Sequence, residues 1–289
     1  MIYKELDGVL PVYKESGYTS YDVIREIKKI VGEKQKIGHA GTLDPFARGV
    51  LPVVFGRATK AIPFISESEK EYIATIGFGS FTDTDDVTGN VTERFDKLPS
   101  LEEIIKILPQ FRGKLKQLPP KFSALRVKGK RAYEIARKGG NVELKERIVE
   151  VFHIEILNYN EKEGTLKLKI LCSSGTYIRS IARDIGKVLS CGGYLKELER
   201  TRSCNLQLKD CIRLQGLLLQ DIEANLIPVE RLIDYPSIEW EGSESYIYEG
   251  RNLSFNNVPD GKYKLVKGKK LLAIIEKKNG KFFYQRVFQ

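Results

Sequence analysis

The stretch GHAGTLDPFARG at residues 38–49 is punctuated by glycines and has no helical or strand-like periodicity. Together with Lys36 and Ile37 it is therefore predicted to form a loop over residues 36–49. Its carboxylate, Asp44, lies between Leu43 and Pro45. Glycines on both sides let the backbone approach a ligand closely, and Pro45 stiffens the chain without an N–H to donate. An aspartate in a loop is more often a turn or capping residue than a catalyst, so spacing alone leaves the role of Asp44 open.

Regular elements are predicted on both sides of this loop. A helix is expected to begin near Thr19, which can cap it, and to end at Gly32. The spacing of apolar residues predicts further helices at residues 100–108 and 176–189, and strands at residues 51–55, 72–79, 148–157 and 165–171. The strands and helices follow no regular βαβα alternation. This order favours an α+β fold with a mixed, mainly antiparallel sheet.

A domain boundary is expected near Pro236, because the composition changes there. Beyond it, short strand-like runs at residues 252–255, 261–266, 270–275 and 281–288 are separated by Gly, Asn and Pro. The sequence therefore predicts a main domain at residues 1–235 and a small β-rich domain at residues 236–289. A domain of about 50 residues is too small to be comfortably stable alone, so it is expected to dock on the main domain.

The charge of the chain is uneven. The net charge is +10, and residues 112–138 hold ten Lys and Arg against one acidic residue. Residues 251–289 hold a further ten against two. Such asymmetry is typical of a protein that contacts phosphates, although a solvated face of mixed charge is the alternative. A membrane surface is the weaker interpretation, because neither stretch forms an amphipathic helix with a clean apolar face.

Several classes of protein are disfavoured by the sequence. No window approaches the ~20 apolar residues of a membrane span, and the first residues do not resemble a signal peptide, so a cytoplasmic protein is expected. The four cysteines form no C-x-x-C pair and suggest no disulfide framework. Nucleotide-binding glycine motifs and clustered metal ligands are missing, and the carboxylates at positions 83, 85 and 86 lack the calcium-loop pattern. We expect no cofactor and no metal.

A family resemblance runs through the chain in a set of short motifs. Residues 38–53, GHAGTLDPFARGVLPV, resemble the active-site motif of the TruB family of tRNA pseudouridine synthases. The other blocks occur in family order from about residue 8 to 205. They are similar to the K-x-Y element at residues 70–72, T-D-T-x-D-x-x-G at 82–89, Q-x-P-P-x-x-S-A at 117–124, C-S-x-G-T-Y-I-R at 172–179 and L-x-R-T at 198–201. The last ~50 residues match only loosely, by position and by the run QRVF at residues 285–288, where the family carries a PUA-type RNA-binding module.

The resemblance implies a function for particular residues. Asp44 would be the catalytic carboxylate, Arg179 its bidentate partner, and Tyr72 a ring in the uracil pocket. The RNA-binding residues would be His39, Asp86, Tyr177, Lys128, Lys130 and Arg131, the last three within a basic insertion at about residues 112–140. The catalytic domain would enclose a central active-site cleft. Cys172 is interpreted as a packing residue rather than a nucleophile.

The implied reaction is the isomerisation of a uridine in the T-loop of tRNA, uridine 55 by family resemblance, to pseudouridine. The enzyme would flip the base out of its stack and rearrange the glycosidic bond with Asp44 acting either as nucleophile or as base. It would act on the T-arm as a monomer, with no obligatory protein partner.

Two other readings stay open at the level of sequence. A guided enzyme of the box H/ACA type shares the aspartate motif, but its members usually have a longer C-terminal module than the ~50 residues found here after Pro236. The third interpretation is an RNA-binding or RNA-folding protein whose catalytic site is inactive. The presence of Asp44, Tyr72 and Arg179 counts against it.

Overall fold

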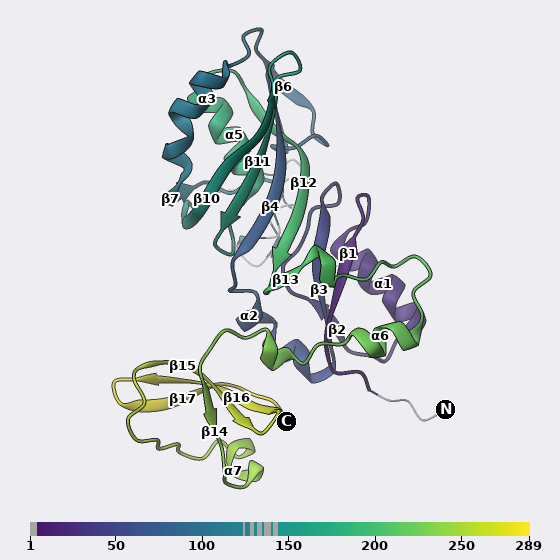
Figure 1. Cartoon of the computed structure of the whole chain (residues 1–289), viewed down its shortest axis with the longest axis vertical. Coiled ribbons are helices and arrows are strands. Elements are labelled where there is room, and N and C mark those ends of the chain that lie inside the picture. The colour runs from purple at the N-terminus through teal and green to yellow at the C-terminus, as the bar shows by residue number, and fades with distance from the viewer. Residues whose placement is uncertain (1–4, 124, 128–129, 132–134, 136–139, 141–143) are drawn as a thin grey trace.

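The protein has a large body and a smaller C-terminal unit, seen in a computed structural model that describes residues 5–123, 125–127, 130–131, 135, 140 and 144–289 (Figure 1). Within those residues the body is built on one nine-stranded sheet with the path β1-β3-β12-β4-β11-β10-β7, to which β2 and β13 are added beside β3 and β12. The strands are β1 Gly8–Lys14, β2 Ile37–His39, β3 Arg48–Phe55, β4 Lys70–Phe78, β7 Gly113–Gln117, β10 Arg147–Asn160, β11 Thr165–Cys172, β12 Gly193–Ser203 and β13 Leu206–Gln207.

The predicted α+β class with a mainly antiparallel sheet is confirmed. Neighbouring strands of the body are antiparallel throughout, apart from the parallel contact of β12 with β3. The helices are α1 Ser20–Val31, α2 Ile62–Ile65, α3 Leu101–Ile107, α5 Ile178–Val188, α6 Leu219–Asn225 and α7 Glu244–Tyr248. In Figure 1, α3 and α5 lie beside β10, β11 and β4, whereas α1 and α6 lie beside β1 and β3. The two groups of helices thus cover different parts of the same sheet.

The end signals of α1 act as the sequence predicts. The Thr19 hydroxyl accepts from the Asp22 N–H at 3.0 Å, and the Asp22 carboxylate accepts from the Thr19 N–H at 2.8 Å. Gly32 ends the helix with a φ of +95°, which an L side chain rarely adopts. Val23 and Ile27 then bury the apolar face of α1 against β1 and β3. This packing fixes the segment that precedes residues 38–49.

The half of the sheet that contains β4 and β11 has its own apolar core. Ile178, Ile181 and Ile185 of α5 pack with residues of β4 and β11, including Ala74 and Leu168. The α5 helix starts two residues later than predicted, at Ile178, because Tyr177 is still extended with φ −94° and ψ 111°. This packing holds the start of α5, and with it residue 179, against the sheet.

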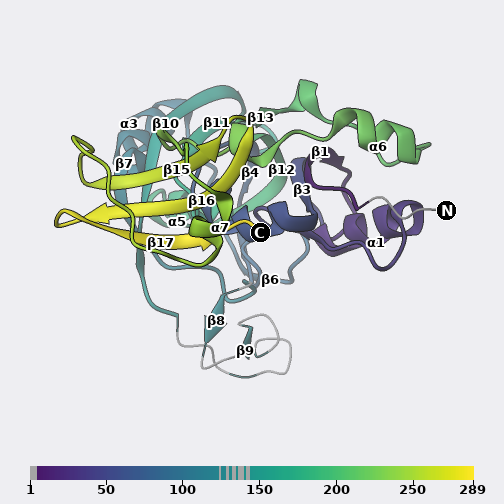
Figure 2. The same cartoon turned by 90° about the horizontal axis from the view of Figure 1, so that it is seen from below.

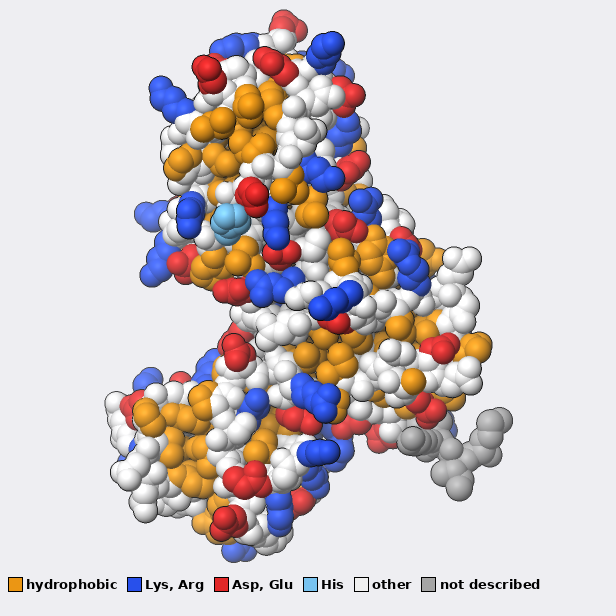
Figure 3. Space-filling view, viewed as in Figure 1, with side chains coloured by type: hydrophobic (Ala, Val, Ile, Leu, Met, Phe, Trp, Pro, Cys, Tyr) orange, Lys and Arg blue, Asp and Glu red, His pale blue; other side chains and the backbone are white. Residues whose placement is uncertain are grey.

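The C-terminal unit is a four-stranded sheet in the order β14-β15-β16-β17. Its strands are β14 Ser237–Glu239, β15 Gly261–Lys267, β16 Lys270–Lys278 and β17 Lys281–Val287. The expected docking is observed, because Leu271, Ile274 and Phe288 share one buried cluster with Val54 and Ile65 of the body. Figure 3 shows a notch between this unit and the upper part of the body.

One predicted strand is wrong. Residues 252–255 lie in a loop, and β14 pairs with β15 instead. The apolar residues of this loop pack inward rather than joining the sheet: the Phe255 ring meets Trp240 at a centroid distance of 6.2 Å and Phe282 at 5.2 Å. Apolar alternation here therefore reflects side-chain packing without strand pairing.

Two hairpins extend from the body. The first pairs β5 Ser80–Thr82 with β6 Val91–Arg94. The second pairs β8 Arg126–Val127 with β9 Lys130–Arg131, inside the basic stretch, and Figure 2 shows it standing away from the main sheet. No helix in the described ranges is long and apolar enough to cross a membrane.

Candidate active site

A cleft of about 480 Å³ opens between the two halves of the body sheet, a size typical of ligand pockets. One wall is the loop between β2 and β3, and the others come from β4, β12, the start of α5 and the chain around α2. Its lining residues are 41–44, 63, 66, 67, 70, 72, 174–179, 198 and 200. The predicted loop is thus present at residues 40–47, while residues 37–39 of the same region form the short strand β2 and Arg48 and Gly49 already belong to β3.

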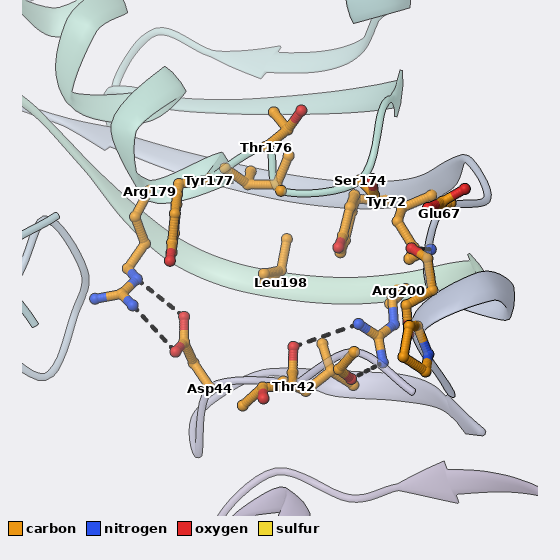
Figure 4. Close-up of a pocket in the computed structure, with 17 residues that line it drawn as sticks. Thr42, Asp44, Glu67, Tyr72, Ser174, Thr176, Tyr177, Arg179, Leu198 and Arg200 are labelled. Carbon is orange, nitrogen blue, oxygen red and sulfur yellow. Dashed lines mark hydrogen bonds and ion pairs between the residues drawn. The ribbon is translucent and has the colours of Figure 1, made fainter. Parts of the chain in front are cut away.

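Asp44 and Arg179 meet at one end of this cleft (Figure 4). Arg179 Nη2 donates to Asp44 Oδ1 at 3.1 Å, and Nε lies 2.9 Å from Oδ2. The Arg179 side chain is 5% exposed and the Asp44 side chain 33% exposed, so the carboxylate keeps an open side toward the cleft. A planar guanidinium that contacts both oxygens fixes the orientation of the carboxylate as well as its charge.

A second carboxylate lies on the other side of Arg179. Arg179 Nη1 is 3.4 Å from Asp86 Oδ2 and donates to the Thr84 carbonyl at 3.1 Å. Asp86 is buried, and its Oδ1 accepts from the Thr84 hydroxyl at 2.8 Å and from the Thr88 N–H at 2.9 Å. Asp86 was predicted to contact RNA, but its carboxylate is enclosed by these partners. Its place in the fold supports a role in holding Arg179.

The electrostatic balance at Asp44 has several contributions. Burial raises the pKa of the Asp44 carboxyl, Arg179 and Lys14 oppose the rise, and the charge of Asp86 adds to it. Lys14 is fully buried and donates to the carbonyls of Tyr18 at 2.6 Å and Pro45 at 3.3 Å. Burial lowers the pKa of Lys14 to about 8. The carboxylate is therefore more basic than a solvated aspartate, while its geometry is held by a guanidinium.

Two tyrosines line the cleft. Tyr72, on β4, is 8% exposed, and burial raises the pKa of its phenol, so it is protonated at neutral pH. Tyr177 precedes α5, and Gln117 holds its backbone by accepting from the Tyr177 N–H at 2.8 Å and donating to its carbonyl at 3.1 Å. In Figure 4 the Tyr177 ring lies near Arg179, and the Tyr72 ring lies farther along the cleft, beyond Leu198.

The structure thus brings together four of the predicted site residues, namely Asp44, Arg179, Tyr72 and Tyr177. His39 is half-buried on β2 and Asp86 is buried, and neither is among the residues that line the cleft.

The three basic candidates belong to the β8–β9 region. Lys130 and Arg131 lie on β9, but only their backbone is described, and Lys128 falls outside the described residues. Their contact with RNA stays a prediction.

The cleft also contains residues that the sequence did not single out. Lys70, Leu198 and Arg200 all line it. Their signal was present in the K-x-Y and L-x-R-T motifs, which the resemblance covered without giving these positions a role. Cys172 is fully buried, and burial raises its pKa to about 12, which supports the packing interpretation. The described residues hold no group of three or more His, Cys, Asp or Glu side chains that could bind a metal ion.

The fold and the site together define a protein with an oriented carboxylate and a buried phenol in one partly open cleft. Family models give the particular class: residues 28–178 match the N-terminal domain of TruB family pseudouridylate synthases, and residues 179–233 match the tRNA pseudouridylate synthase B C-terminal domain. The chain belongs to the TruB family of pseudouridine synthases, which are isomerases.

Individual relatives agree with this assignment. The chain is 40% identical over 255 residues to the tRNA pseudouridine synthase B of Syntrophomonas wolfei, and the match covers 86% of this chain and 85% of that protein. It is 38% identical over 291 residues to that of Francisella tularensis, covering 98% and 95%. Among solved structures, a chain of a Cbf5-Nop10-Gar1 complex is similar in fold, with a TM-score of 0.72 at 24% identity, covering 98% of this chain and 85% of that one.

Proposed function

We propose that this enzyme converts a uridine in the T-loop of tRNA, at position 55, to pseudouridine with Asp44 as the essential carboxylate. The observation that carries the proposal is the Asp44–Arg179 pair at the end of a cleft that Tyr72 also lines. In the reaction the N1–C1′ bond breaks, the uracil turns, and a C5–C1′ bond forms. A proton leaves C5 and one is taken up at N1, so the reaction has no redox change, no leaving group and no need of a cofactor or metal.

The residues of the cleft suit this chemistry in different ways. Asp44 has one side open to the cleft, from which it can act as nucleophile at the sugar or as base, and both routes are consistent with its raised pKa. Arg179 keeps the carboxylate aimed at the ligand. The Tyr72 ring can stack on the extruded uracil, and its protonated phenol can exchange a proton. His39 is proposed to face the RNA near the gap that the flipped base leaves.

Binding of tRNA is proposed to extend beyond the cleft. We assign residues 1–235 to the catalytic domain, with its basic insertion at about 112–140, and residues 236–289 to a PUA-like RNA-binding domain. Flipping a base out of its stack costs a few kcal/mol, which phosphate contacts can offset. The projecting β8–β9 hairpin is rich in basic residues and is suited to such contacts.

The enzyme is proposed to act alone, as a monomer in the cytoplasm. The relatives at 38–42% identity are named tRNA pseudouridine synthase B and match this chain over 81–95% of their own length. The likeness to guided enzymes is at 24% identity and supports a shared fold. These identities favour the stand-alone reading over a guided one.

The test is to incubate the purified protein with an unmodified tRNA transcript and no other component. The RNA is then treated with carbodiimide, and the adducts that survive alkali are mapped at every uridine. A single adduct in the T-loop is expected. An adduct that forms only when a guide RNA or accessory protein is added, or at a uridine outside the T-loop, would overturn the proposal.

A further inference from the structure

Arg200 occupies a central position between the two sides of the cleft. Its backbone on β12 pairs with Tyr72 of β4 on one edge and with Gly49 of β3 on the other. Arg200 therefore lies between β4, which carries Tyr72, and β3, which follows the Asp44 loop.

The Arg200 guanidinium donates to three backbone carbonyls, two in the loop that carries Asp44 and one at the start of β3. It is 1% exposed, and Nε donates to the Val50 carbonyl at 2.8 Å. Nη2 donates to the Gly41 carbonyl at 2.9 Å, and Nη1 lies 3.4 Å from the Thr42 carbonyl (Figure 4). No ion pair joins Arg200 to a carboxylate in the described part of the chain. The cation is thus solvated by the backbone of the catalytic loop.

Two glycines make this arrangement possible. Gly49 has a φ of +112°, and a Cβ there would lie 2.2 Å from the Arg200 carbonyl oxygen, so β3 and β12 can meet only without a side chain. Gly41 has a φ of +87°, and a Cβ would lie 3.4 Å from Arg200 Nη1. Gly49 therefore lets the two strands approach each other, and Gly41 lets the loop take the left-handed backbone conformation that presents its carbonyl to the guanidinium.

Other groups hold the rest of the loop. The Ser20 hydroxyl accepts from the Leu43 N–H at 2.9 Å and donates to the Leu43 carbonyl at 3.2 Å, and Lys14 donates to the Pro45 carbonyl. Arg200 is the support on the N-terminal side of Asp44, next to the cleft. It also affects the tyrosine, because its charge and a hydrogen bond from it oppose the rise in the pKa of Tyr72 caused by burial.

We propose that Arg200 is a positioning residue for the reaction: it sets the Asp44 loop and the Tyr72 phenol at a fixed separation on the two sides of the base. The inference rests on the proposed function of the cleft. A planar fork can donate to two successive carbonyls while its Nε reaches a third, whereas an ammonium on a single tip cannot span them. Arg200 acts through Asp44 and Tyr72 and needs no contact with the substrate.

The test compares Arg200→Lys with Arg202→Lys, which lies two residues along the same strand, is 28% exposed and pairs with Glu69 at 3.1 Å. In Arg200→Lys the single-turnover rate at saturating enzyme should fall about ten- to a hundredfold, with tRNA affinity within about threefold. Amide hydrogen exchange at residues 40–47 should quicken. The Arg202→Lys control should match the wild type in both measurements.

A double-mutant cycle with Tyr72→Phe separates positioning from a general loss of structure. If Arg200 acts through the tyrosine, the effects of Arg200→Lys and Tyr72→Phe on the rate are not additive; additive effects would contradict the proposal. Should Arg200→Lys fail to fold, Gly41→Ala keeps the buried charge and strains the backbone whose carbonyl Arg200 holds, because Gly41 has a φ of +87°. The same loss of rate is expected.

The outcomes also separate this inference from the proposed function. Rates within twofold of the wild type and unchanged exchange at residues 40–47 in both Arg200→Lys and Gly41→Ala would overturn the role of Arg200. A wild-type protein that modifies no uridine, together with faster exchange in Arg200→Lys, would instead remove the proposed reaction and leave Arg200 as the support of the loop.

Discussion

The Arg179→Lys substitution tests whether the cleft depends on guanidinium geometry or only on positive charge. Arg179 contacts both oxygens of Asp44, one oxygen of Asp86 and the carbonyls of Thr84 and Phe122. A lysine keeps the charge, but its single ammonium cannot reach all these groups at once. At least one of the two contacts with Asp44 is therefore lost, and the carboxylate gains freedom to turn.

The expected size of the effect follows from those contacts. A hydrogen bond to a charged group contributes about 1.5–3 kcal/mol. If one such contact with Asp44 is lost in the transition state, the rate falls about 10- to 150-fold, at about 1.4 kcal/mol per factor of ten. Affinity for tRNA should change little, because Arg179 is buried and points at Asp44 rather than outward. Arg179→Ala is a poorer test, since it leaves the buried carboxylate of Asp86 and the half-buried one of Asp44 without their cation, and loss of a buried partner costs about 3–5 kcal/mol of stability.

The assay is a single-turnover measurement at saturating enzyme, which removes the binding contribution from the rate. Arg183→Lys is the matched control. It lies one turn further along α5, its side chain is 11% exposed, and it pairs with Asp85 and Asp184 at 2.8 Å each. The control should stay within about threefold of the wild type. A rate for Arg179→Lys equally close to the wild type would refute the requirement for the planar guanidinium. Weaker tRNA binding with a normal single-turnover rate would indicate that Arg179 contacts a phosphate instead.

Three further predictions concern other parts of the molecule. Asp44→Asn should bind tRNA within about threefold of the wild type yet form less than one-hundredth of the product in single turnover. A higher residual activity would show that another group is essential. On the proposed function the reaction needs the ionised Asp44 carboxylate, so activity should fall as pH drops through the raised pKa of Asp44. Because the charge of Asp86 adds to that rise, Asp86→Asn should move the acid limb of the pH–rate profile to lower pH, and an upward shift would contradict this. Reversing the charges of Lys128, Lys130 and Arg131 together should weaken tRNA binding and flatten the fall of log K with log salt, whereas an unchanged slope would place the three side chains away from the RNA.

Local signals were enough to predict much of the fold. The bounds of α1 follow from a capping threonine and a terminal glycine, and β10 and β11 follow from apolar alternation on both sides of a turn. The loop at residues 40–47 and its carboxylate were also visible, because glycines and a proline interrupt every regular pattern there. These features depend on residues that are close in the chain.

The strand β12 was not predicted, although it organises the cleft through Leu198 and Arg200. The pairing of β12 with β4 shifts register between Leu195 and Glu197 and again between Arg200 and Arg202. Each irregularity breaks the period of two, so that Leu195 and Leu198 are both buried three residues apart, as on a helix. Such irregularities are set by tertiary pairing and leave no simple local pattern.

Buried cations are the other feature that the composition conceals. Lysine and arginine are almost never fully buried unless paired, so a count of basic residues places Lys14 and Arg200 on the surface. Both are instead enclosed around the Asp44 loop, where they donate to the carbonyls of residues 18, 41 and 45 among others. The loop that places the Asp44 carboxylate in the cleft forms no helix or strand over residues 40–47. Its carbonyls then need donors from elsewhere, and long side chains on neighbouring strands supply them. The same requirement that makes residues 38–49 unlike a helix or a strand therefore explains why charged residues far away in the sequence are buried beside them.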